Sequence, residues 1–119
     1  MEEKANQLSE RFLAYAVEIV KITTLLRKTA TGRQIAGQLL RSGTSAGANY
    51  EEGCGAQSRA DFIHKLQIVF KELRESLFWL KLIRKSDLLR DEGMEWLIKE
   101  TIELSNIIGK SLITAKKGK

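Results

Sequence analysis

The chain carries the stretch Ser42-Gly43-Thr44-Ser45-Ala46-Gly47-Ala48-Asn49-Tyr50-Glu51-Glu52-Gly53 shortly before a long run of apolar residues at helical spacing. A glycine inside a helix costs on the order of 1 kcal/mol relative to alanine. Close packing against a neighbouring helix is the simplest compensation, and it would bury the Asn49 amide, which then needs partners and fixes the register. We therefore assign a role in structure or assembly to five residues, Gly43, Ser45, Gly47, Asn49 and Glu52.

Apolar residues recur at helical spacing along the rest of the chain, and proline is absent. The pattern predicts helices over about 6–28, 32–52, 58–85 and 91–114, separated by short connections. A chain of 119 residues fits one domain, here 1–119, with a single core. Four long helices with short connections favour an all-α fold, an antiparallel up-down-up-down four-helix bundle.

The first predicted helix is apolar over more than one face. Leu8, Phe12, Tyr15, Ile19, Ile22 and Leu26 form one stripe at alternating spacings of four and three residues. Leu13, Val17 and Val20 widen that stripe. A face this broad needs more than one neighbour to cover it, so we expect a homo-oligomer.

Cysteine content and the amino terminus indicate a compartment. The single cysteine, Cys54, cannot form a disulfide within the chain, and Glu2 and Glu3 stand where a signal peptide would carry basic residues. No apolar run approaches the roughly 20 residues that span a bilayer. We therefore expect a cytoplasmic protein with no membrane contact.

The positive charge is concentrated in one segment. The chain has a net charge of +5, and residues 56–85 hold an excess of basic groups. A basic helix face indicates a nucleic acid or an acidic protein as partner, although a solvated face is the competing interpretation. Arg74 and Lys81 are placed to pair with acidic groups of neighbouring helices or subunits. We therefore expect the nucleic acid to be bound by Arg59, Lys65, Arg84 and Lys85, with additional contacts from Lys116 and Lys117.

Two patterns raise the possibility of an enzyme. A di-iron bundle needs two histidines in Glu-x-x-His pairs, and His64 is the only histidine. Glu72-x-x-Glu75 and Glu100-x-x-Glu103 have the spacing with which all-α nucleotide pyrophosphohydrolases hold Mg²⁺, a hard cation that prefers oxygen ligands. Pairing of these glutamates with lysine or arginine, within or between helices, explains the same residues at less cost. We expect no catalytic residue, metal or cofactor, and keep the Mg²⁺ enzyme as an alternative.

Three segments in combination carry a family resemblance. They are Gln38-Leu39-Leu40-Arg41-Ser42-Gly43-Thr44-Ser45-Ala46-Gly47-Ala48-Asn49-Tyr50-Glu51-Glu52, then Ser58-Arg59-Ala60-Asp61-Phe62-Ile63-His64-Lys65-Leu66, then Lys71-Glu72-Leu73-Arg74-Glu75-Ser76 with Trp79-Leu80. With them the chain resembles the bacterial four-helix bundle proteins encoded in intervening sequences of 23S ribosomal RNA genes. The match is strong over residues 35–85 and weaker over the first and last helices.

The resemblance has consequences for assembly and partners. It implies a homopentamer of four-helix bundles with a basic surface. It also implies kinship with the accessory variability protein of diversity-generating retroelements, which binds nucleic acid and its reverse transcriptase. We therefore expect a non-enzymatic oligomer that binds RNA or DNA, or a nucleoprotein such as a reverse transcriptase. The alternative is a pure assembly scaffold.

Overall fold

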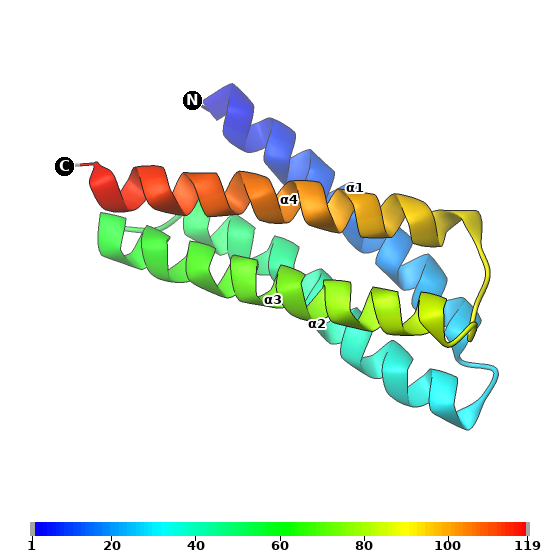
Figure 1. Ribbon diagram of the computed structural model, residues 1–119. Helices are drawn as coiled ribbons and strands as arrows, with labels where there is room; N and C mark the ends of the chain where they lie inside the picture. The colour runs from blue at the N-terminus through cyan, green and yellow to red at the C-terminus, as the bar shows by residue number, and fades with distance from the viewer. Residues whose placement is uncertain (1, 119) are drawn as a thin grey trace.

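The computed structural model describes residues 2–118, and these form four helices and no strand. The helices are α1 (Glu2–Leu26), α2 (Ala30–Cys54), α3 (Arg59–Lys85) and α4 (Glu92–Lys117). They run up-down-up-down in a body measuring 49 × 22 × 20 Å, so the start of α1 and the end of α4 lie at the same end (Figure 1). The all-α four-helix bundle is confirmed; residues 1 and 119 of the expected domain lie outside the described residues.

Polar side chains cap the amino termini of three helices. Thr29, Ser58 and Asp91 lie just before α2, α3 and α4, and each accepts a hydrogen bond from a backbone N–H of the first turn. The Ser58 Oγ lies 3.0 Å from the Asp61 nitrogen, which agrees with the predicted start of this helix at about residue 58. These side chains satisfy amides that have no partner inside the helix.

Helix α4 continues further than the sequence indicated. The sequence predicted that this helix ends at about residue 114, yet it runs to Lys117. The Arg59 guanidinium donates to the Ala115 carbonyl at 3.1 Å, and the Gly118 nitrogen donates to the Thr114 carbonyl at 3.0 Å. Both bonds satisfy carbonyls that a helix end leaves without a partner, which explains why the last turn persists.

The core consists of one apolar stripe from each long helix. The stripe predicted on α1 is buried from Phe12 to Leu26, and the stripe on α3 is buried from Leu66 to Ile83. On α4 the buried apolar residues are Met94, Leu97, Ile98, Leu104 and Ile108. Leu88 and Leu89 of the connection after α3 also pack against this core.

The small residues of α2 admit close neighbours, as predicted. A Cβ added to Gly43 would lie 2.9 Å from Ile19, and one added to Gly47 would lie 3.3 Å from the Phe12 Cβ. Gly53 follows the predicted end of this helix at about residue 52, but it lies inside α2, where an added Cβ would be 3.2 Å from the Lys65 Cβ of α3. Gly37 has open space instead, so close packing does not explain this glycine.

A buried layer of hydroxyls joins all four helices. The Tyr15 hydroxyl lies 2.6 Å from Thr101 Oγ1, which links α1 to α4, and Ser42 Oγ lies 2.8 Å from Ser76 Oγ, which links α2 to α3. Burial raises the pKa of Tyr15 to about 12, while hydrogen bonding to Thr101 and Ser76 opposes that rise. All four residues are excluded from solvent. Polar partners at fixed positions in an apolar core favour one register of the helices.

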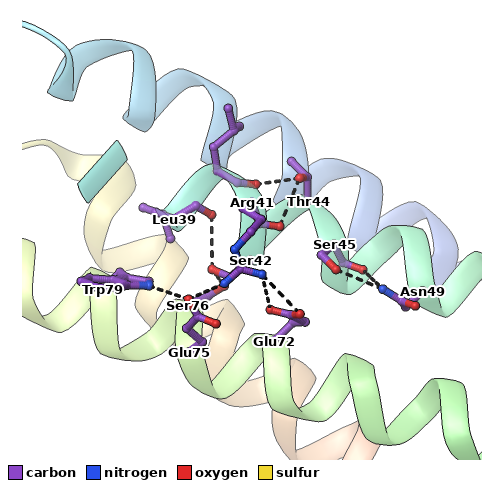
Figure 2. Close-up of polar contacts among 11 residues, drawn as sticks. Leu39, Arg41, Ser42, Thr44, Ser45, Asn49, Glu72, Glu75, Ser76 and Trp79 are labelled. Atoms are coloured by element: carbon purple, nitrogen blue, oxygen red, sulfur yellow. Dashed lines mark hydrogen bonds and ion pairs between the residues drawn. The ribbon is translucent and has the colours of Figure 1, made fainter. Parts of the chain in front are cut away.

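Asn49 does not have the expected role. Its side-chain nitrogen donates to the carbonyl oxygen and the Oγ of Ser45, one turn earlier in the same helix, at 2.9 and 3.0 Å (Figure 2). The residue is half-buried, and both partners belong to α2. The prediction that Asn49 fixes the register between helices is therefore wrong for the single chain. The hydroxyl layer fills that role because its members reach across helix boundaries.

One face of α1 remains uncovered. Leu13 is 60% exposed, Val17 45% and Val20 47%, although the opposite stripe of the same helix is buried. Helix α1 packs more extensively on α2 than on α4, and it crosses α4 at an angle (Figure 1). Within residues 2–118 no helix is both long and apolar enough to cross a membrane.

Candidate nucleic-acid interface

Helix α3 presents a row of exposed cations. Lys71, Arg74, Lys81 and Lys85 follow one another at spacings of three, seven and four residues, which keeps them on one side of a helix. All four are exposed, and none forms an ion pair with an acidic group within the described part of the chain. We call these four residues the α3 basic row. Arg74 and Lys81 were expected to pair with acidic groups, and within this chain that expectation is wrong.

The glutamates nearest to the basic row are engaged elsewhere. Arg41 of α2 contacts Glu72 at 3.2 Å and also binds Glu75, and the Trp79 indole N–H donates to Glu75 at 3.0 Å (Figure 2). The Arg41 hydrogen bond, assisted by that of Trp79, holds the pKa of Glu75 below its usual range. Glu72 and Glu75 therefore form their ion pairs with Arg41 of α2 and not with the α3 basic row, although the single guanidinium offsets only part of their charge.

Two of the predicted binding residues are paired. Lys65 contacts Glu52 of α2 at 2.5 Å, and Arg84 contacts Glu95 of α4 at 3.1 Å. Glu52, expected to serve structure, thus joins α2 to α3 through Lys65. The two pairs are largely exposed, so each stabilises the fold little. A phosphate would have to compete with these carboxylates for the same cations.

The predicted binding residues do not gather in one cluster. Arg59 lies beside the end of α4, near the exposed Lys116 and Lys117, whereas Arg84 and Lys85 lie at the other end of α3. At 1.5 Å per residue, the two groups are separated by roughly 40 Å along the helix. Only Lys85 belongs both to the predicted set and to the α3 basic row.

The second glutamate pair is also bound to an arginine. The Arg11 guanidinium of α1 donates to Glu100 at 2.7 and 3.0 Å and to Glu103 at 3.1 Å. These hydrogen bonds raise the pKa of Arg11. Each pair proposed for the Mg²⁺ enzyme thus faces a cation from another helix. Residues 2–118 contain no group of three acidic, histidine or cysteine side chains suited to a metal.

Sequence reasoning missed an aromatic residue within the basic row. Phe78 is 59% exposed and lies four residues after Arg74 and three before Lys81. Its ring packs edge-on against Trp79, with centroids 5.0 Å apart and planes at 74°. An aromatic residue interleaved with basic residues at helical spacing is a signal that the sequence already contained.

The chain as a whole is similar to proteins of a known family and to a solved structure. The family model described as 23S rRNA-intervening sequence protein matches residues 4–110. A crystal structure of a protein of unknown function, from the S23 ribosomal protein family of Bacteroides thetaiotaomicron VPI-5482, is 36% identical with a TM-score of 0.84. The match covers 92% of this chain and 97% of that one. No curated protein matches the chain.

Proposed function

The chain belongs to the 23S rRNA-intervening sequence protein family, and from that membership and the charge on α3 we propose a non-enzymatic, oligomeric helical bundle that binds RNA or DNA. The observation that carries the proposal is the α3 basic row, four exposed cations whose neighbouring glutamates form their ion pairs with Arg41 instead. Each of the two glutamate pairs forms an ion pair with an arginine of another helix. Carboxylates held in this way are less available to Mg²⁺, which supports a binding role over Mg²⁺ chemistry.

Binding would rest mainly on contacts with the phosphate backbone. Lysine and arginine displace condensed counterions when they neutralise phosphates, and that release favours binding without reading the sequence. The α3 basic row spans about 21 Å along the helix axis at 1.5 Å per residue. We therefore expect binding with little sequence preference and with a steep dependence on salt. Lys116 and Lys117 at the far end remain candidate auxiliary contacts.

Assembly of several copies would multiply this charge. The uncovered face of α1, with Leu13, Val17 and Val20, supports an interface between copies, and five copies is the number that the family resemblance implies. This same observation favours the second candidate function, a pure assembly scaffold. The kinship with the accessory variability protein that the sequence resemblance implies would extend the proposal to a nucleoprotein partner such as a reverse transcriptase.

A salt series with two charge-matched variants tests the nucleic-acid proposal. One variant carries glutamine at all four positions of the α3 basic row. The control carries glutamine at Lys4, Lys28, Lys99 and Lys110, which are exposed cations outside α3. Affinity for a fluorescent 20-nucleotide RNA is measured by anisotropy between about 50 and 300 mM salt. We expect the first variant to lower the slope of log affinity against log salt by about 3, at roughly 0.7 per lost phosphate contact on a single strand.

The outcomes separate the two candidate functions. The control should keep most of its affinity, because its lysines lie away from the proposed surface. Equal loss in both variants would show that net charge, and not the α3 basic row, attracts the nucleic acid. Absence of binding by the unaltered protein at about 50 mM salt would refute nucleic-acid binding and leave the scaffold.

A further inference from the structure

Phe78 lies at the centre of the α3 basic row. Arg74 and Lys81 flank it within one helical turn on either side, and Lys71 and Lys85 lie two turns away in each direction. Leu82, one turn after Phe78, is 36% exposed and continues the apolar surface. A large exposed aromatic side chain loses nothing in packing if a ligand covers it, and it gains the burial of its ring.

The structure holds this ring in a defined orientation. Trp79 packs against the core, and its indole N–H is fixed by Glu75, which is in turn bound by Arg41 (Figure 2). Phe78 rests edge-on against that indole. A ring braced in this way loses little further freedom on binding, and such preorganisation favours affinity.

The ligand that fits this surface has a flat apolar face within reach of negative charge. An unpaired nucleobase has that face, and its own phosphates supply the charge for the flanking cations. In a duplex the base faces are covered by their neighbours, and exposing one requires unstacking. We propose that α3 binds single-stranded nucleic acid, with a base stacked on Phe78 and the backbone held by Arg74 and Lys81. This inference rests on the proposed nucleic-acid function and assigns its substrate class.

Stacking is tested with single strands and a duplex of the same sequence. Phe78→Ala and Phe78→Leu are compared with Ile113→Ala, a control at a residue on α4 that is 57% exposed. We expect Phe78→Ala to weaken binding of a single-stranded RNA on the order of tenfold and to leave duplex binding unchanged. Phe78→Leu should bind the single-stranded RNA nearly as weakly as Phe78→Ala does, because leucine keeps the apolar character but removes the π face. Matched RNA and DNA single strands show whether the 2′-hydroxyl contributes.

A second readout follows the base itself. An oligonucleotide that contains 2-aminopurine should lose fluorescence when that base stacks on Phe78, and the loss should disappear in Phe78→Ala. The inference is overturned if Phe78→Ala leaves single-strand affinity and fluorescence unchanged while the basic-row variant still loses binding; in that case the proposed function stands alone. A change in oligomeric state with Phe78→Ala would also overturn it, since Phe78 would then belong to an interface between copies.

Discussion

At the scale of single residues, buried hydroxyls distinguish this bundle from a purely apolar one. Ser42 and Ser76 are fully buried and bond to each other between α2 and α3. Ser105 of α4 presents the opposite case, because its buried Oγ has no hydrogen-bond partner among residues 2–118. A buried hydroxyl that lacks a partner retains the cost of desolvation without recovering it.

We therefore predict opposite effects of alanine substitution at Ser76 and at Ser105. Ser76→Ala should lower the free energy of unfolding by about 1–3 kcal/mol, because it removes the 2.8 Å partner of the buried Ser42 hydroxyl and leaves only the longer bond to the Leu39 carbonyl at 3.4 Å. Ser105→Ala should be neutral or stabilising by up to about 1 kcal/mol, since no hydrogen bond is lost. Urea denaturation of both variants measures the difference. If both substitutions destabilise equally, the hydroxyl layer has no special part in the core.

At the scale of helices, α2 is shaped by where its glycines face. Gly43 is buried against Ile19 of α1, and that side chain is itself fully buried and has little room to move. Gly37 lies on the exposed side of the same helix with no atom within contact of an added Cβ. The same residue type thus serves close packing at one position and has no packing role at the other.

Leucine substitution should separate these two glycines. Gly43→Leu overpacks the contact with α1 and should destabilise the fold by about 1–3 kcal/mol or more. Gly37→Leu, the matched control, should stabilise it by up to about 1 kcal/mol through better helix propensity. Thermal unfolding followed by circular dichroism gives both values. An unchanged melting temperature for Gly43→Leu would mean that α1 and α2 do not approach as closely as the structure shows.

At the scale of the whole molecule, the chain leaves an apolar surface uncovered while it completes its own core. Leu13 and Val17 line a groove with Trp96 of α4, and Leu13 also borders a groove between α1 and α2 that includes Thr44 and Gly47. Contiguous apolar surface of this kind marks an interaction site. Because the same face belongs to every copy, an interface between copies would cover it in all of them.

We therefore predict that charge on this face prevents assembly. Leu13→Glu with Val17→Glu should convert the proposed oligomer to a 13.5 kDa monomer at micromolar concentration, because carboxylates would be desolvated at the proposed interface. Ile113→Glu, at an equally exposed position of α4, is the control and should leave the oligomer intact. Sedimentation velocity measures both species. A monomeric unaltered protein would contradict the assembly proposal.

By itself, the sequence determined the four helices and most of the core, because the spacing of apolar residues on α1 and α3 selects the face that each helix buries. The contacts of Gly43 and Gly47 followed from the same reasoning, since small residues inside a helix require a close neighbour. Local signals such as the Ser58 cap were equally visible. The helices, their buried faces and the caps depend on residues that are near one another along the chain, whereas the partners of Gly43 and Gly47 on α1 came only from the structure.

Only the tertiary structure decided which charges are compensated. Arg41 meets Glu72, Arg11 meets Glu100, and Arg84 meets Glu95 because distant segments are brought side by side, and no spacing along one helix encodes those pairs. For this reason the sequence placed Lys65 and Arg84 among the binding residues and set Arg74 and Lys81 aside. The α3 basic row can be recognised only when α2 and α4 are in place. The side chains that surround a cation in space, and not its neighbours in sequence, decide whether it has an acidic partner.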